Sequence, residues 1–488
     1  MDLPRPGLHR HDGFGPPHRG PRDRGLRGSL GRPQVSEPTG EPEAPARDGR
    51  PGWYRLTWFL GRPPALTDRQ WKVLGLVAIV SLFEQYDLYL FSLNLKQIQA
   101  DLAIAEASLG WLGSVVRAGA LFSIPIALAA DRMGRRRLLL ATVVAYTLLT
   151  GATALAQDTA TFVVLQFLAR SFAVAETLIA VVVIAEEFPA EHRGWGIGAL
   201  GAIQACGAGI AGIAFGFVDV LPHGWRDLYL FGLGPLVAVA YWRRNLPETE
   251  RFEALRQERD GDAGLRASPP LAPIVHLVRE HPVRIGALIL AVLVVAAAAS
   301  PAAFFAPKFL QDVHGWSPAG VAALTFLGGM FAIIGNPLAG WLSDRHGRRP
   351  IATVFGAGFV VMTLGFYGLT GFMAPALWIL LIFTMMGSEV PLAAFSAELF
   401  PTAQRSTASG LRVGAASVGG IAGLAIVSAL FSVTGSNWTG IMLLCLAVLV
   451  VPVVVWAAFP ETARRSLEET SREPSREGRR RAEPQGSA

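Results

Sequence analysis

Charge is scarce in this sequence. Only 16% of its 488 residues are Asp, Glu, Lys or Arg, whereas a soluble domain typically carries about 25%. Hydrophobic residues make up 51%, and apolar runs of about 20 residues, the length that crosses a bilayer core of about 30 Å, recur along the chain. Because backbone groups in lipid must be hydrogen-bonded internally, we expect these runs to be helices.

Cysteine is scarce, and phosphate-binding loops and metal-ligand spacings are absent. Cys206 and Cys445 lie in separate apolar runs, which argues against a disulfide framework. No Gly-x-x-x-x-Gly-Lys-Ser/Thr loop occurs, so ATP is not expected to drive the protein. The nine histidines lack the spacing of a metal site. We therefore expect no cofactor, no bound metal and no enzymatic activity.

Twelve apolar segments predict an all-α polytopic membrane protein. They lie at 71–93, 108–130, 138–156, 160–185, 195–218 and 228–243, and then at 284–306, 317–342, 350–370, 374–398, 407–433 and 438–459. This predicts two six-helix halves, 69–243 and 284–463, joined by a cytoplasmic linker at 244–283. The Pro-, Gly- and Arg-rich residues 1–68 and the charged residues 464–488 are expected to be disordered cytoplasmic tails, because they cannot bury a core.

Basic residues are concentrated in a few short loops. Arginines gather at 132–137, at 345–349 and in the linker, whereas the loops on the other side hold single basic residues such as Lys96. Positive loops stay in the cytoplasm, so both termini are expected there, in the cell membrane. The net charge of +6 thus reports topology, and nucleic acid is not expected as a partner.

Three short motifs occur twice, in the same order. Asp131-Arg132-Met133-Gly134-Arg135-Arg136 recurs 213 residues later as Asp344-Arg345-His346-Gly347-Arg348-Arg349. Glu186-Glu187-Phe188-Pro189 followed by Arg193 recurs 212 residues later as Glu398-Leu399-Phe400-Pro401 followed by Arg405, and Pro247-Glu248-Thr249 recurs at Pro460. Each copy follows the equivalent helix, which indicates a duplicated six-helix half.

These motifs resemble those of the major facilitator superfamily, from about residue 70 to 463. The resemblance is to its sugar-porter-like branch, which includes carriers of organic and aromatic acids. It implies two pseudo-symmetric halves that rock around a midplane site, with a latch at the cytoplasmic side. The predicted gate comprises Asp131, Arg132, Gly134, Arg135, Glu187, Arg193, Asp344, Arg345, Gly347, Arg348, Glu398, Arg405 and Arg412. We expect ion pairs of Glu186 or Glu187 with Arg193 and of Glu398 with Arg405, and the alternative for them is ordinary interfacial pairing with water. The alternative for the two arginine-rich turns is that their residues only fix topology and the turn.

Ionisable groups inside the apolar helices mark a candidate pathway, since each is costly in lipid unless paired or hydrated. Glu84 and Asp87 are three residues apart and share one helical face. We predict that Asp87, then Glu84, together with Glu176, couple transport to protons. Arg117 and Arg170 are either their counter-charges or anchors for an anionic substrate. The alternative is a permanently paired structural cluster.

The second half contributes fewer such groups. Glu389 precedes the helix break at Pro391, and Arg412 lies on the next helix. Glu389 and Tyr86 join Arg117 and Arg170 as candidates for substrate binding or charge compensation. The sequence thus predicts a monomeric secondary transporter that moves a small polar or anionic metabolite, an organic acid or a sugar, by proton symport and alternating access. A proton-coupled efflux antiporter and a non-transporting membrane sensor are the alternatives.

Overall fold

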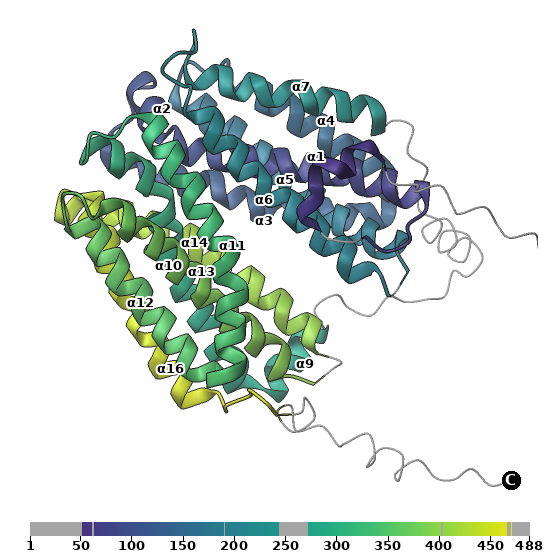
Figure 1. Ribbon diagram of the computed structural model, residues 1–488, viewed down its shortest axis with the longest axis vertical. Coiled ribbons are helices and arrows are strands. Elements are labelled where there is room, and N and C mark those ends of the chain that lie inside the picture. The colour runs from purple at the N-terminus through teal and green to yellow at the C-terminus, as the bar shows by residue number, and fades with distance from the viewer. Residues whose placement is uncertain are drawn as a thin grey trace, which may run out of the picture. The chain divides into compact units, whose positions relative to one another are not determined.

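The computed structural model describes residues 51–60, 63–189, 191–243, 272–401, 404–465 and 470. The predicted tails and linker therefore fall largely outside the described residues. Within residues 49–488 the helices of the first half, purple to teal, gather in one bundle, and those of the second half, green to yellow, in another (Figure 1).

In the described residues, each half consists of six long helices. The first half has α1 (Asp68–Leu93), α3 (Leu109–Met133), α4 (Arg135–Thr153), α5 (Thr159–Glu187), α6 (Arg193–Phe215) and α7 (Trp225–Arg243). The second has α10 (Pro282–Asp312), α11 (Pro318–His346), α12 (Arg348–Gly368), α13 (Ala374–Glu398), α14 (Arg405–Thr434) and a last helix made of α15 (Asn437–Leu446), η3 (Ala447–Leu449) and α16 (Val450–Ala458). Shorter helices are η1 (Gly52–Leu60), α2 (Leu95–Asp101), η2 (Glu106–Ser108) and α9 (Ala272–Glu280).

Ten helices in the described part of the chain are long and apolar enough to cross a membrane. The other two long helices, α4 and α7, have 19 residues each, which is about 28 Å at 1.5 Å per residue. The prediction of twelve transmembrane helices in two six-helix halves is confirmed, with boundaries close to those expected from hydropathy.

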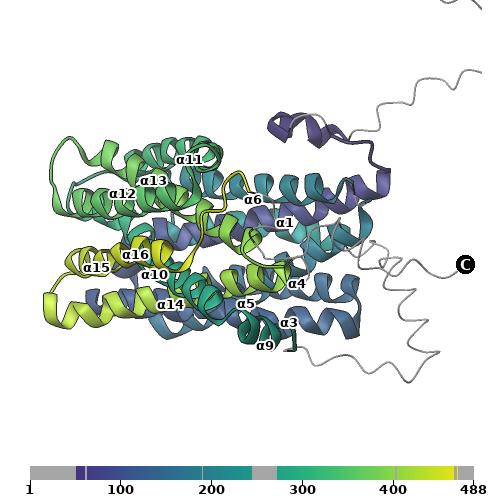
Figure 2. The same ribbon diagram turned by 90° about the horizontal axis from the view of Figure 1, so that it is seen from below.

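The duplication seen in the motifs is repeated in the packing. α1 packs most extensively on α6, and α10 correspondingly on α14; α1 and α6 lie side by side in Figure 2. Glycine permits both contacts. A Cβ on Gly207 would stand 1.9 Å from the Leu82 carbonyl oxygen, and one on Gly423 would stand 1.9 Å from that of Ala297. Small residues of this kind let helices in lipid approach at backbone distance.

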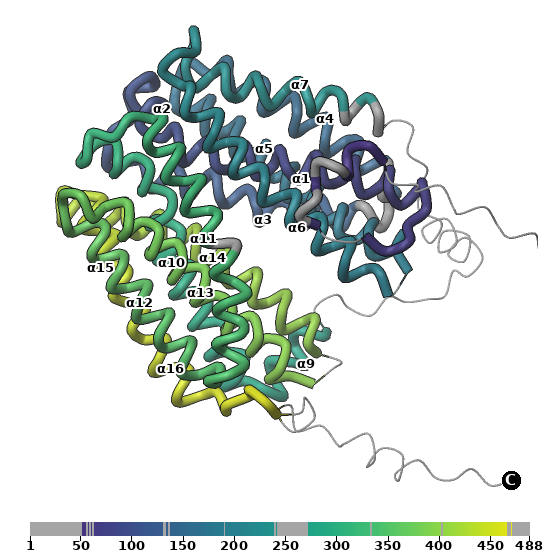
Figure 3. Tube along the Cα trace, in the orientation of Figure 1, coloured from purple at the N-terminus to yellow at the C-terminus, as the bar shows by residue number. Residues whose placement is uncertain are grey.

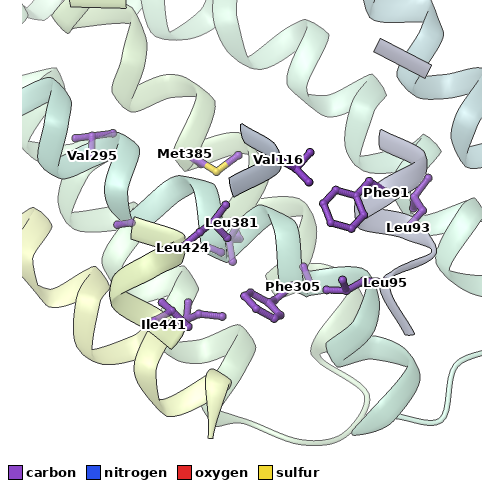
Figure 4. Packing of buried hydrophobic residues seen from close by; sticks show 14 of the residues in the cluster. Phe91, Leu93, Leu95, Val116, Val295, Phe305, Leu381, Met385, Leu424 and Ile441 are labelled. Carbon is purple, nitrogen blue, oxygen red and sulfur yellow. The ribbon is translucent and has the colours of Figure 1, made fainter. Parts of the chain in front are cut away.

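One apolar cluster spans both halves. Figure 4 shows side chains of the two halves in it, among them Phe91, Leu95 and Val116 from the first and Phe305, Leu424 and Ile441 from the second. The helices that meet here are α3 with α14, α6 with α11, and α1 with α10.

A polar network joins the halves at the end of the helices opposite the two Asp-Arg-x-Gly-Arg-Arg turns. Lys308 is 4% exposed, and its Nζ lies 3.2 Å from Glu106 and in direct contact with Asp312. Lys96 Nζ lies 3.0 Å from Asp312. The Gln97 amide of the first half donates to Gln311 of the second. The Asn437 amide of the second half donates to Glu106 of the first. We call Lys96, Gln97, Glu106, Lys308, Gln311, Asp312 and Asn437 the inter-half network.

Residues 52–60 correct the prediction of a disordered tail up to residue 68. They form η1, the dark purple segment that leads into α1 (Figure 3). Its Tyr54 ring lies 4.9 Å from that of Trp71, which in turn is 6.1 Å from Trp195 on α6. Aromatic rings bury large apolar areas, and this cluster attaches η1 to the helices.

Replacing Gly423 by Ala is expected to destabilise the fold by about 1–3 kcal/mol, because the new Cβ must displace the α10 backbone. Gly414 on the same helix has no neighbour within 4 Å. Gly414→Ala should therefore leave stability unchanged or raise it by up to about 1 kcal/mol. Thermal unfolding in detergent measures both, and equal shifts of the two variants would contradict the packing argument.

Candidate functional site

The site is built around a carboxylate pair on α1. A capping box starts this helix: Thr67 accepts a hydrogen bond from the Gln70 amide, and the Gln70 side chain accepts one from the Thr67 amide. Glu84 and Asp87, one turn apart, are only 5% and 7% exposed. Both therefore face into the first half, as their spacing predicted.

Glu84 is held by three donors from two other helices. Arg170 Nη1 on α5 lies 3.3 Å from its Oε1. Thr177, two turns further along α5, donates to Oε2, and Gln204 Nε2 on α6 donates to the same oxygen at 3.2 Å. The glycine contact at Gly207, one turn after Gln204, brings α6 close enough to α1 for this bond. A buried charge pair with its remaining lone pairs satisfied is tolerated where a single charge is not.

The carboxylate of Asp87 has fewer hydrogen-bond partners than that of Glu84. Thr150 Oγ1 on α4 donates to its Oδ2 at 3.3 Å, while Oδ1 is buried and accepts no hydrogen bond from the described residues. Tyr146, which also lies on α4, donates to the Phe83 carbonyl at 2.9 Å. Glu176 on α5 is fully buried in the same half. The three acids predicted to couple protons thus all lie inside the first half.

Tyr86 is packed inside the first half. Its side chain is 1% exposed, and its hydroxyl donates to the Leu228 carbonyl on α7 at 2.8 Å. The ring packs edge-on against Phe83 at 5.7 Å. Both its ring and its hydroxyl are thus engaged within the first half, and its role in substrate binding or charge compensation stays a prediction.

The two arginines of the first half differ in their surroundings. Arg170 is the counter-charge of Glu84. Arg117, on α3, has no hydrogen bond or ion pair among the described residues and lies against Gly420 of α14, in the other half. In the second half, Arg412 Nη1 lies 3.6 Å from Glu389 Oε2, so this predicted gate residue is joined to a predicted site residue.

The predicted gate pairs are replaced by different partners. Glu187 binds Arg69 through two hydrogen bonds of 2.8 and 2.9 Å, and Glu398 binds Arg348 at 2.8 Å. These forked contacts satisfy both carboxylate oxygens. Arg193 and Arg405, expected to pair with the two glutamates, each donate instead to a backbone carbonyl five residues earlier, that of Phe188 or Phe400.

Both copies of the arginine-rich turn have the backbone that glycine permits. Gly134 has φ = 97° and Gly347 has φ = 104°. In the second copy, Arg348 bridges Asp344 at 2.6 Å and Glu398, and Arg345 lies 5.4 Å from the ring of Trp341. The side chains of Asp131, Arg132 and Arg135 in the first copy lie outside the described residues.

Glu461, in the second Pro-Glu-Thr motif, caps the helix that follows this turn. Its carboxylate accepts hydrogen bonds from the α12 amides of Arg348 at 2.7 Å and Arg349 at 3.1 Å, and from those of Thr462 and Ala463 at 3.0 Å. Burial alone would raise the pKa of Glu461, but these four amides hold it below its usual range. The first Pro-Glu-Thr copy lies outside the described residues.

Several contributors were not expected from the sequence. Thr177, Gln204 and Thr150 supply the bonds to the α1 carboxylates, and Arg69 supplies the partner of Glu187. A polar residue inside an apolar helix is the only sequence signal they carry. Among the described residues, no group of three or more His, Cys, Asp or Glu could hold a metal ion.

An apolar bundle of two six-helix halves with charges buried in its interior defines a polytopic transporter. The profile of the Major Facilitator Superfamily matches residues 77–391, and the chain belongs to this family. The family and the relatives below are transporters rather than enzymes, and the protein is a multi-pass membrane transporter.

Named relatives and solved structures agree with this assignment. A putative metabolite transport protein of Haemophilus influenzae is 26% identical over 82% of this chain and 98% of its own length. A gallate transporter of Pseudomonas putida is 27% identical over 77% and 88%. The crystal structure of a D-xylose-proton symporter superposes with a TM-score of 0.65 at 17% identity, over 81% of this chain and 99% of that one, which shows the shared fold.

Glu461→Gln is expected to lower stability by about 1 kcal/mol or less at pH 7, the size of a lost helix cap. Because the folded pKa lies below the unfolded one, Glu461 stabilises the fold above its unfolded pKa of about 4.3, and this contribution is lost as the pH falls through the folded value. Thermal melts should therefore separate wild type and variant at pH 7 and bring them together at about pH 3. A difference that persists at pH 3 would show that the carboxylate's charge is not responsible.

Proposed function

We propose that the protein imports a small organic acid together with a proton across the cell membrane, by alternating access and as a single chain. The observation that carries this proposal is the Glu84–Arg170 pair, buried between α1, α5 and α6. An ion pair of this kind inside a membrane domain is costly to build and is typical of a proton or substrate pathway. The name of the gallate transporter adds support for an organic acid over a sugar.

The pair offers a simple coupling step. While Glu84 is ionised, Arg170 neutralises it. When Glu84 takes a proton, its attraction for Arg170 is lost and the guanidinium charge becomes available to other groups. Asp87 lies one turn further along α1 with one unbonded oxygen and is the second candidate to carry the proton. Because Arg170 is ion-paired with Glu84, we propose Glu84 as the first and Asp87 as the second candidate for the proton-coupling carboxylate.

Alternating access requires that the two halves separate at one end and close at the other. The inter-half network would hold the end opposite the arginine-rich turns closed, which corresponds to a site open toward the cytoplasm if those turns are cytoplasmic. Arg348 with Glu398 and Arg69 with Glu187 would keep each half rigid at the cytoplasmic end.

Uptake into proteoliposomes tests the coupling. For one proton per monovalent anion, an inward gradient of one pH unit should accumulate labelled organic acid about tenfold. Glu84→Gln should abolish this accumulation while counterflow exchange persists, and Asp87→Asn should reduce it. Asp219→Asn, at an exposed position, is the matched control. Accumulation by Glu84→Gln at the wild-type level would refute the role of Glu84, and gradient-driven export would favour an antiporter.

Distance measurements test the inter-half network. Lys308→Met removes the cation that Glu106 and Asp312 share, and Asp312 keeps only Lys96 at 3.0 Å. Because both carboxylates are partly exposed, we expect a cost below the ~3–5 kcal/mol that breaking a buried pair typically has. Spin labels at the exposed Ala100 and Val433, with both native cysteines replaced by serine, should then report a larger population of long distances.

Lys72→Met, at an exposed position near the start of α1, serves as the control for the removal of one positive charge. An unchanged distance distribution in Lys308→Met would show that the network does not hold this end closed.

A further inference from the structure

Arg117 is a cation to which the described part of the chain offers no paired anion. It is half buried near the middle of the membrane span formed by α3, and no carboxylate of the described residues lies within ion-pair distance of it. We propose that Arg117, where it meets the Gly420 face of α14, binds the carboxylate of a planar organic acid between the two halves. The inference rests on the proposed function and names its substrate class and anchor.

The missing side chain of Gly420 leaves room for the Arg117 guanidinium. A Cβ on this residue would stand 2.8 Å from Arg117 Nε and 3.2 Å from both Cζ and Nη2. α14 also contacts α3 at the residue after Gly420: Ser114 Oγ on α3 donates to the Ile421 carbonyl at 2.9 Å. Arg117 belongs to the first half and Gly420 to the second, so an anion bound here would be held where the halves meet.

Two of the acidic residues inside the membrane helices already have an arginine partner. Glu84 is bound by Arg170, and Glu389 is paired with Arg412. Asp87 and Glu176 lie inside the first half, whereas Arg117 contacts the second. An uncompensated arginine within the bilayer costs several kcal/mol, and a substrate carboxylate would remove that cost when it binds. The guanidinium fork suits a carboxylate through two parallel hydrogen bonds.

Aromatic side chains next to Arg117 favour a planar substrate body. Tyr89 on α1 is 40% exposed and lies within electrostatic range of the guanidinium. Phe304 of the second half contacts α3 at Gly113, one turn from Arg117, and its ring lies 5.1 Å from that of Phe91. An aromatic or conjugated ring bound beside the arginine would stack on such neighbours.

The anchor is also linked to the proton site. Arg170 lies beside α3, because its Cβ is 3.2 Å from where a Gly119 Cβ would stand, and it interacts electrostatically with Arg117. When Glu84 is neutral, Arg170 loses its ion-pair partner, although Asp87 is still near it, and the positive potential at Arg117 rises. Proton and anion therefore favour each other's binding, and by linkage this coupling is reciprocal.

Binding to the purified full-length protein tests the anchor. Calorimetry with benzoate and with benzamide, which has the same shape without the charge, should show a preference for benzoate of at least about tenfold. Arg117→Gln should abolish this preference. Gly420→Ala, which keeps the charge but displaces the guanidinium, should weaken benzoate binding several-fold, whereas Gly414→Ala should not. Glu84→Gln should bind benzoate more tightly than wild type does.

The outcomes separate the two proposals. Wild-type benzoate affinity in both Arg117→Gln and Gly420→Ala would overturn the anchor and leave proton coupling by Glu84 standing. Failure of the wild type to bind benzoate, gallate and cis,cis-muconate would overturn the substrate class in both. Binding that depends on Arg117, in a protein whose uptake ignores Glu84 and the proton gradient, would retain the anchor and refute the coupling.

Discussion

Lipid offers no hydrogen bonds, so each polar group buried in the bundle must find its partner within the protein. Most do so locally. Thr142, Thr147 and Thr363 donate to carbonyls one turn earlier, and the hydroxyls of Tyr86 and Tyr146 reach backbone carbonyls of other segments. Glu84 satisfies the same requirement with a charge, using side chains of α5 and α6. Arg117, which has no hydrogen bond or ion pair among the described residues, and Asp87, with one unbonded oxygen, are two charged exceptions among several buried polar groups that lack a partner there.

Satisfying these groups depends on how closely the helices approach. Gly207 brings α6 against the α1 backbone, and Gln204 thereby reaches Glu84. Gly420 plays a different part, because it leaves room for a side chain of the opposite half. Small residues thus permit close backbone packing, both within a half and between the halves at Gly110 and Leu424, and at Gly420 they make room for the Arg117 side chain. A glycine in an apolar run carries no signal of which role it has until the facing helix is known.

The fold could be predicted from the sequence because its two determinants are local. Hydropathy locates each span, and the repeat of Asp131–Arg136 at Asp344–Arg349 establishes that the halves correspond. Ion-pair partners could not be predicted in the same way. Glu187 and Arg193 are close in sequence, yet Glu187 binds Arg69, which is 118 residues away. Arg193 donates instead to the Phe188 carbonyl at the end of α5, where the last carbonyls of a helix have no partner within it.

The asymmetry between the halves follows from where the charges are compensated. In the first half, Glu84 and Arg170 are closely paired and hydrogen-bonded on several sides, and they lie beside the helix that carries Arg117. In the second, Glu389 is more exposed than Glu84, and its pair with Arg412 is looser at 3.6 Å. A carboxylate bound at Arg117 would add the anion that the first half lacks and would touch α14 at the same time. Proton binding within one half would in this way change how strongly a ligand holds both halves together, which is the link that a symporter needs between its two sites.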